Sequence, residues 1–452
     1  MFSLKSFSRT KSSPEKGLSL SGRTQIDCMD RDLRSVNGAK RIIELILSRR
    51  NVTKLILGHN ALSDDGCVLL FAFLSSPLGR KYPIAEISLN ANSIGDRGLT
   101  AISAYLIDNT TLIELFLQDN LFTSDSMTVT RFAHAINQSR LRVLSLTTNR
   151  ALADDFCRLF FPALRSRHLQ ELHLSAIGLT RHAAPYIADY IASADRCRLH
   201  TLKCNGNGLA YSGVRTIIRA IERANSSLTV VELYSNNIAS GHDSEDTEDD
   251  AGRETQAYNP EAWKDTEKLL KQVLGRNTHL KKETWREALQ LLVYSRAVLL
   301  RSSKAPFNYD DFANSPASTT SFPFKRLPTE IQLHILSFLS PTLSPSQRAR
   351  IYTYASSPST LLPLLPSLSS RSTSFTEPAV FSMCVPDPSV NMGSSGNARA
   401  SPVWPVNDSA NGGCAPGKCM GRRSLLCHLE QRRTSWLDQV GCLAYDPGTE
   451  TV

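Results

Sequence analysis

The chain has 452 residues, of which 41% are hydrophobic and 21% are charged, and its formal net charge is +9. This composition is of the globular type, and at roughly 150 residues per domain the length allows about three domains. No stretch reaches the ~20 consecutive apolar residues that a membrane-spanning helix needs, so a membrane protein is excluded. The basic residues form no dominant cluster, which argues against nucleic acid as a partner.

The first 23 residues are basic and contain no apolar segment. We therefore expect a disordered tail here, and neither a secretory signal nor a transit peptide. Without a secretory signal, the ten cysteines are expected to be reduced thiols in the cytoplasm or the nucleus.

A short motif, L-x-L-x-x-N, recurs seven times along the first half of the chain. Its asparagine place is held by Asn60, Asn92, Asn120, Asn149, Ile177, Asn207 and Asn236. The steps between these positions are 32, 28, 29, 28, 30 and 29 residues. Near-equal spacing of this kind indicates a solenoid, in which each repeat buries its apolar face against its neighbours.

These residues resemble the leucine-rich repeat family in its ribonuclease-inhibitor-like form. The resemblance implies an α/β horseshoe with parallel strands on the concave side and helices on the convex side. An apolar helix over 39–47 is expected to cap the first repeat, and a helix over 285–300 to cap the last.

The last full repeat is too long. Asn277-Thr278-His279-Leu280 repeats the signal that leads from helix to strand at Asn109 and Asn225, but it comes 52 residues after the previous one. Residues 242–254 contain seven Asp or Glu and one Arg, and like charges at that density stay solvated. We expect an acidic loop inserted at about 241–258.

Side chains that flank the strand leucines are expected to face outward on the concave side. Candidate partner-binding residues there are Glu86, Glu114, Phe116, Glu171, His173, Lys203, Glu232 and Tyr234. Aromatic residues within a polar surround are typical of binding surfaces. The alternative is a solvated face with a few incidental aromatic residues.

Catalysis finds little support, because no nucleophile, metal-binding or phosphate-binding motif is present. Ran GTPase-activating proteins are similar leucine-rich repeat crescents with an acidic segment after the repeats. This likeness leaves activation of a small GTPase as an alternative, although no residue matches a catalytic position.

Residues 326–339, RLPTEIQLHILSFL, carry a second motif. Pro328 and Glu330 suit the start of a helix, and Ile331, Ile335 and Leu339 would share one apolar stripe with Leu336. Ser344-Pro345-Ser346-Gln347 predicts the start of a second helix that runs to Tyr354.

The segment resembles the opening of an F-box, which binds the Skp adaptor of a cullin–RING ubiquitin ligase. The resemblance implies that Leu327, Pro328, Ile331, Ile335 and Leu339 engage that adaptor while the repeats hold an unknown substrate protein. The later Trp of F-boxes is missing, and the motif follows the repeats, whereas F-boxes usually precede them. The alternatives are a helical subdomain packed on the solenoid end and a plain repeat scaffold.

Cysteines gather near the end of the chain: Cys414, Cys419, Cys427 and Cys442. Four thiols allow a tetrahedral zinc site, although the spacing is not that of a standard C-x-x-C pair. Free thiols on a helical tail are the alternative. The apolar spacing predicts a helix over 424–440 that ends at Gly441.

The sequence thus predicts a non-catalytic protein that binds other proteins. Its expected parts are a disordered tail (1–23), a capped repeat domain (24–304), a linker (305–325), an F-box-like helical segment (326–366), a disordered Ser/Pro-rich linker (367–413) and a cysteine-containing helical tail (414–452).

Overall fold

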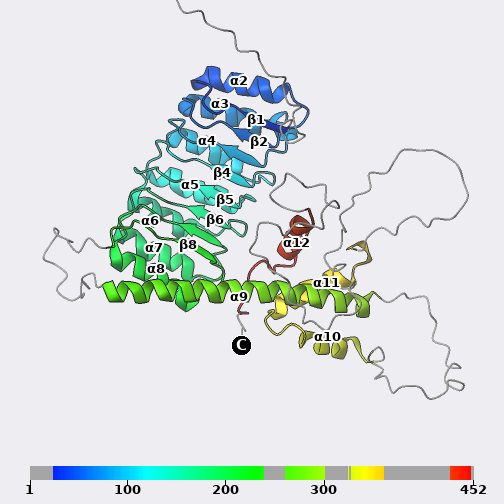
Figure 1. Ribbon diagram of the computed structural model, residues 1–452. Helices are drawn as coiled ribbons and strands as arrows, with labels where there is room; N and C mark the ends of the chain where they lie inside the picture. The colour runs from blue at the N-terminus through cyan, green and yellow to red at the C-terminus, as the bar shows by residue number, and fades with distance from the viewer. Residues whose placement is uncertain (1–23, 239–259, 301–323, 325–326, 361–427, 449–452) are drawn as a thin grey trace, which may run out of the picture. The chain divides into compact units, whose positions relative to one another are not determined.

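The computed structural model describes residues 24–238, 260–300, 324, 327–360 and 428–448 (Figure 1). It divides into two compact units, Met1–Leu274 and Gly275–Val452. The division falls inside one long helix, whereas the sequence placed the end of the repeat domain at residue 304. The predicted tails, linkers and acidic insert (1–23, 241–258, 305–323 and 367–413) lie outside the described residues, as do residues 361–366 of the F-box-like segment.

In the described part of the first unit, eight strands form one parallel sheet in sequential order. They are β1 (Gln25–Asp27), β2 (Lys54–Ile56), β3 (Glu86–Ser88), β4 (Glu114–Phe116), β5 (Val143–Ser145), β6 (Glu171–His173), β7 (Thr201–Lys203) and β8 (Val230–Glu232). The middle residue of each strand, such as Leu115 or Leu172, points into the core and is buried. The predicted repeat architecture is therefore confirmed.

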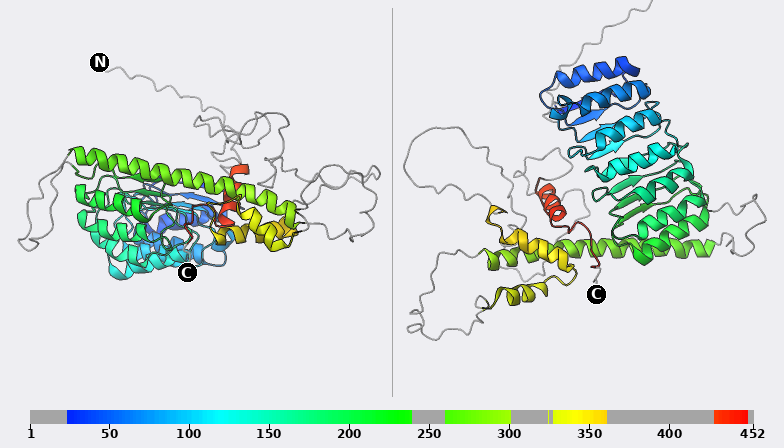
Figure 2. Two further views of the ribbon diagram at one scale, coloured as in Figure 1. Left: turned by 90° about the horizontal axis from the view of Figure 1, so that it is seen from below. Right: turned by 180° about the vertical axis from the view of Figure 1, so that it is seen from behind.

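A layer of helices covers the inner face of this sheet (Figures 1 and 2). The layer comprises α2 (Ser35–Leu47), α3 (Ser63–Ser75), α4 (Asp96–Leu106), α5 (Ser126–Asn137), α6 (Ala153–Ala163), α7 (Ala184–Ala192) and α8 (Ala210–Ala224), with 3₁₀ turns η1 (Gly79–Lys81) and η2 (Arg181–Ala183). Below, the concave face means the opposite face of the sheet, away from these helices.

Strand β1 belongs to a repeat that the motif search missed. Ile26 and Cys28 are buried in its apolar places, but Arg31 stands where six of the other seven repeats have asparagine. The Asn60 side chain of the next repeat accepts from the backbone N–H groups of Arg31 and Leu33, at 3.1 and 3.0 Å. The first repeat thus lacks the motif but still receives its neighbour's hydrogen bonds.

Buried asparagine side chains join the repeats along one edge of the sheet. Asn120 is representative: its Oδ1 accepts from the N–H groups of Asn92 (3.2 Å) and Ile94 (3.1 Å) in the preceding repeat. Its Nδ2 donates to the carbonyls of Leu89 (3.1 Å) and Leu117 (3.0 Å). One amide therefore satisfies four buried backbone groups, which explains why asparagine recurs at this place.

We call the places held by asparagine, or by Ile177 in one repeat, the ladder positions. The residue before each of them has a positive φ. His59, Ala91, Asp119, Thr148, Ala176, Gly206 and Ser235 all adopt this left-handed conformation, with φ between 51° and 66°. The turn redirects the chain from the strand toward the helix layer, so every repeat places one exposed or half-buried loop residue on each side of its buried ladder residue.

The repeat core contains an aromatic cluster near its centre. Phe160 is fully buried, stacks on Phe156 with ring centroids 4.7 Å apart, and lies 6.3 Å from Phe132. Phe161 meets Phe160 edge-on at 5.7 Å and contacts Tyr190 at 5.2 Å. Side chains from consecutive repeats thus fill one continuous core.

Helix α9 (Pro260–Leu299) is 40 residues long and spans the division between the units. Its first part packs on the repeat core through Trp263, Leu269, Leu270, Val273 and Leu274. The helix-to-strand signal at Asn277 ends no helix, since α9 runs through Asn277 without a break, and the helix predicted over 285–300 is the latter part of α9. The residues that follow Leu280 are Lys281, Lys282 and Glu283, which favour a helix and offer no apolar strand face.

The second unit is a small helical domain built on one core. It combines the rest of α9 with α10 (Thr329–Ser337), α11 (Pro345–Ser356), η5 (Pro358–Thr360) and α12 (His428–Gln439). The core residues are Ala288, Leu289, Leu291, Leu292, Leu336, Leu343, Ile351, Ala355, Trp436, Leu437, Val440, Cys442 and Leu443. The F-box-like segment and the cysteine-containing tail therefore share a core.

The predicted helix signals of this domain are confirmed in the described residues. Ser344 caps α11 and forms a capping box with Gln347, and the chain leaves α12 through Gly441 at φ +68°. No helix in the described ranges has the length and apolar character needed to cross a bilayer.

Candidate functional site

The concave face is the first candidate binding surface, and the parallel register arranges its side chains in rows. One row contains Lys54, Glu86, Glu114, Val143, Glu171, Thr201 and Val230, and the next contains Ile56, Ser88, Phe116, Ser145, His173, Lys203 and Glu232. All eight predicted concave-face residues lie on this face. The strand order thus brings together side chains that are up to 148 positions apart, from Glu86 to Tyr234.

Ion pairs between neighbouring strands occupy both ends of the face. Lys54 pairs with Glu86 between β2 and β3. Lys203 Nζ lies 3.0 Å from Glu232 Oε1 between β7 and β8, and Asn205 donates to the other Glu232 oxygen at 2.7 Å. These contacts, with the Lys203 hydrogen bond foremost, lower the pKa of Glu232.

The negative charge of the carboxylates at the centre of the face is less well neutralised. Partial burial, followed by the charge of nearby Glu86, raises the pKa of Glu114. Two strands away, His173 Nε2 lies 3.6 Å from Glu171 Oε2, and this contact lowers the pKa of Glu171. Among the described residues, no cation lies within ion-pair distance of Glu114, which leaves the centre of the face electronegative.

The charge on Glu114 opposes folding above its ordinary pKa. A carboxyl group with a raised folded-state pKa stabilises the fold when it is protonated, and that stability is lost as pH rises through the folded pKa. We expect Glu114→Gln to melt at a higher temperature than the parent at pH 8, with the difference disappearing at pH 4. Thermal unfolding at both pH values, with the exposed Glu44→Gln change as control, measures this effect. An equal difference at both pH values would assign it to packing.

Two aromatic residues differ in how they are presented. Phe116 is half-buried at the middle of the face, whereas Tyr234 is 69% exposed. Tyr234, which the sequence predicted for this face, belongs to a third outward row whose other members, Asn90, Gln118, Thr147 and Asn205, were not predicted. Side chains alternate between the two faces of a strand, so the residue directly after the second leucine of the motif also faces outward. Applying this alternation one residue past that leucine would have found this row.

Polar contacts tie the third row to the strands. Asn90 Oδ1 accepts from the Gln118 N–H at 3.0 Å, and Gln118 Nε2 donates to the Ser145 hydroxyl at 2.9 Å. Ser145 is therefore buried, although its strand position faces outward. These contacts connect the third row to the strands on either side of Phe116.

The second candidate surface lies in the helical domain, and we call it the outer face of α10: it combines Ile331 and Ile335 on the helix with Phe338 and Leu339, which follow its last residue, Ser337. Ile331, Ile335, Phe338 and Leu339 are 46%, 38%, 70% and 36% exposed, respectively. Leu336 is buried on the opposite side and anchors α10 to the domain core. The predicted apolar stripe is thus divided, with Leu336 serving the fold and the other members facing outward.

The remaining F-box-like residues lie at the start of this helix. Pro328 is exposed and is the residue before the first helical position, and Leu327 is half-buried. Phe338 was not among the predicted adaptor-binding residues, although its spacing of three from Ile335 could have placed it beside the stripe. Its ring meets His334 edge-on, with centroids 5.1 Å apart.

The C-terminal segment braces the domain that carries α10. The buried Gln347 side chain donates to the carbonyls of Gly441 (2.8 Å) and Ala444 (3.1 Å), and Trp285 Nε1 donates to that of Leu443 (3.2 Å). Tyr352 donates to the Leu333 carbonyl at 3.1 Å, which connects α11 to α10.

The predicted zinc ligands are only partly within the described residues. Cys414, Cys419 and Cys427 lie outside them. Cys442 is fully buried in the apolar core, and burial raises the pKa of its thiol to about 12. The described residues contain no cluster of three or more His, Cys, Asp or Glu side chains suited to a metal ion. The zinc site stays a prediction.

The parallel sheet, the helix layer and the asparagine ladder define the class of this protein. Within the described residues it is an α/β leucine-rich repeat solenoid joined to a small helical domain. No protein-family model matches the chain.

Comparison with curated proteins supports this class. The chain is 23% identical over 244 residues to the Rho GTPase-activating protein gacW of Dictyostelium discoideum, covering 52% of this chain and 20% of that protein. It is 27% identical over 177 residues to the mouse NACHT, LRR and PYD domains-containing protein 5 (39% and 15% coverage). It is 29% identical over 188 residues to the bovine NACHT, LRR and PYD domains-containing protein 3 (40% and 17%). The chain spans a fifth or less of the length of each of these relatives.

Proposed function

We propose that this protein is a substrate adaptor of a cullin–RING ubiquitin ligase. In this proposal the repeats hold a substrate protein and the outer face of α10 docks on the Skp adaptor. The observation that carries the proposal is the exposed set Ile331, Ile335 and Leu339, because these are residues that the F-box resemblance assigns to adaptor binding. Its setting is the cytoplasm or the nucleus.

The exposed apolar side chains favour a docking role for this face. Large apolar side chains that are exposed together on one short helix are typical of interaction sites. Phe338 adds the largest exposed apolar surface of the set, and aromatic residues are enriched among interface residues that dominate binding. A helix used only for packing would keep such residues inside, as this domain does with Leu336.

Ile331→Ser combined with Ile335→Ser tests the adaptor function. Both side chains are substantially exposed, so the domain should stay folded while the docking surface is lost. We expect Skp binding to weaken at least ~100-fold, as for the loss of two central apolar contacts. Isothermal titration of the purified full chain with the Skp adaptor measures this.

Tyr294→Ser is the matched control, because Tyr294 is an exposed side chain on α9 of the same domain. It should bind as the parent does. A parent chain that fails to bind Skp at high micromolar concentration would refute the adaptor function, and the protein would then be treated as a repeat scaffold.

A second candidate function is regulation of a small GTPase. The similarity to the Rho GTPase-activating protein gacW favours it, together with the crescent's likeness to Ran GTPase-activating proteins. Single-turnover GTP hydrolysis by Ran and by a Rho GTPase, with and without the full chain, tests this function. Unchanged rates would remove it.

A further inference from the structure

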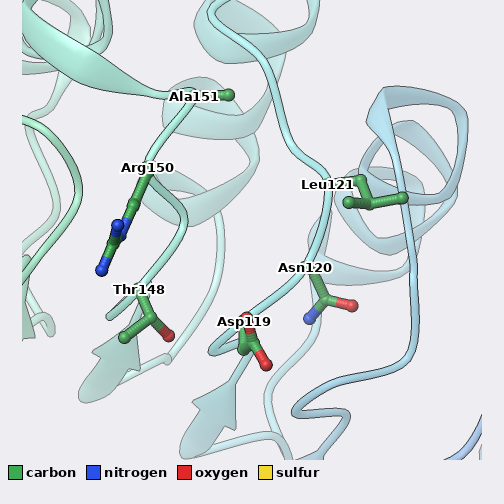
Figure 3. Close-up of a pocket in the computed structure, with 6 residues that line it drawn as sticks. All are labelled: Asp119, Asn120, Leu121, Thr148, Arg150 and Ala151. Atoms are coloured by element: carbon green, nitrogen blue, oxygen red, sulfur yellow. The ribbon is translucent and has the colours of Figure 1, made fainter.

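The loops that follow the strands form a groove along one edge of the repeat domain, separate from the concave strand rows. Two depressions of about 550 and 440 Å³ lie here and meet at Arg150, which lines both. The first is lined by Asp119, Asn120, Leu121, Thr148, Arg150 and Ala151 (Figure 3). We call the two together the rim groove.

Side-chain size along the loop row shapes this groove. The residues that follow the ladder positions are, in order, Leu121, Arg150, Gly178, Gly208 and Asn237. The residues that precede the last three ladder positions are Ala176, Gly206 and Ser235, and these also line the second depression. The glycine, alanine and serine residues leave a trough with a backbone-lined floor, and Arg150 stands at one end of it.

Arg150 occupies an irregular loop because the ladder is interrupted beside it. Where other repeats have asparagine, the next repeat has the buried Ile177, which cannot accept the N–H groups of residues 149 and 151. The loop therefore closes on itself: the Arg150 N–H donates to the Thr148 carbonyl at 3.1 Å, and that of Leu152 to the Asn149 carbonyl at 3.1 Å.

The charge of the groove is uneven. Arg150 is the only charged residue among those lining the second depression, and within the described residues no carboxylate forms an ion pair with it. Figure 3 shows Arg150 and Leu121 on opposite sides of the first depression, with Asp119 and Asn120 between them. Leu121 is 64% exposed. The groove thus offers the Arg150 cation, the Asp119 carboxylate and the Leu121 side chain in the first depression, and a second depression lined mainly by small residues.

We propose that the rim groove binds an extended acidic segment of a protein partner, with a carboxylate of that segment paired to the Arg150 guanidinium. Arginine binds carboxylates through two parallel N–H donors, which fixes the orientation of the bound chain. The trough beyond Arg150 admits an extended backbone, and Leu121 favours an apolar residue on the other side. This inference rests on the proposed role of the repeats in holding a substrate and names the kind of segment recognised.

Peptide display on the purified full chain tests the proposal, with a library of random dodecapeptides as the probe. We expect the parent to enrich peptides that carry Asp or Glu beside an apolar residue. Arg150→Glu should weaken the binding of the enriched peptides about tenfold or more, because it places a carboxylate opposite the ligand's carboxylate. Ala176→Asn should also weaken it by filling the trough, and asparagine tolerates the left-handed backbone at that position (φ +53°).

Arg167→Glu is the matched control, since Arg167 is exposed in the loop that precedes β6, at the opposite edge of the sheet. It should bind the enriched peptides as the parent does. Enrichment without acidic residues, or equal losses in Arg150→Glu and Arg167→Glu, would overturn the proposal. Acidic enrichment that appears only after the acids of residues 243–250 are changed to Asn and Gln would overturn it too, because the chain's own acidic run would then be the occupant.

The display experiment is independent of adaptor binding. Loss of peptide binding in Arg150→Glu with normal Skp binding would support the groove whatever the role of α10. Normal peptide binding in a chain that does not bind Skp would refute only the ligase function.

Discussion

Phe160→Ala is expected to lower the free energy of unfolding of the repeat domain by about 3–5 kcal/mol, the range for removing a fully buried aromatic side chain. Phe160 packs between Phe156 and Phe132 and meets Phe161, so its loss leaves a cavity shared by neighbouring repeats. The surrounding backbone is held by the parallel sheet, so it can only partly relax into the space. Urea unfolding followed by far-ultraviolet circular dichroism measures the change.

Met127→Ala is the matched control for this prediction. Met127 lies on α5 of the same domain but is 70% exposed, and alanine is the better helix former. Its effect should stay within about 0.5 kcal/mol. A similar midpoint shift for both variants would show that the aromatic cluster does not determine the stability of the repeats.

Trp436→Ala is expected to destabilise the helical domain by about 3–5 kcal/mol and to reduce Skp binding, although Trp436 is not on the docking face of α10. Trp436 is buried in the domain core and meets Tyr354 edge-on, with ring centroids 5.9 Å apart. Its removal weakens the contact between α12 and α11, and α11 in turn holds α10. Hydrogen exchange should show lost protection in α10 and α11, with β2 to β7 unchanged.

Trp436→Phe separates packing from hydrogen bonding. The indole N–H of Trp436 has no acceptor among the described residues, so phenylalanine should retain most of the stability. If Trp436→Ala binds Skp as the parent does and keeps α10 protected, the C-terminal segment does not support the docking face.

Some elements were predictable because their signals are local. A strand leucine, its ladder asparagine and the following turn lie within about six residues, so each repeat can be recognised from its own sequence. The same holds for α11, where Ser344 and Gln347 are three residues apart. The first repeat was missed because Arg31 replaces its asparagine, and the neighbour's Asn60 supplies the missing contacts.

Other features depend on residues far apart in the chain. The signal at Asn277 did not end a helix, because the apolar residues on either side of it belong to two different cores. The division of the α10 stripe was equally hidden, since Leu336 is buried by residues from α9, α11 and α12. The rim groove could not be predicted from the sequence, because it depends on which loops adjoin in space. The break in the ladder at Ile177 alters the loop at Arg150, in the preceding repeat.

The sequence by itself determined the repeat period, the α/β solenoid and the residues that face outward on its strands, because these follow from spacings within one repeat. Only the tertiary structure decided which charges are paired, which apolar residues of α10 stay exposed and that Arg150 has no ion pair among the described residues. Pairing and exposure depend on neighbours about 30 residues away in the next repeat, or about 100 residues away in the helical domain, and no local pattern specifies those neighbours.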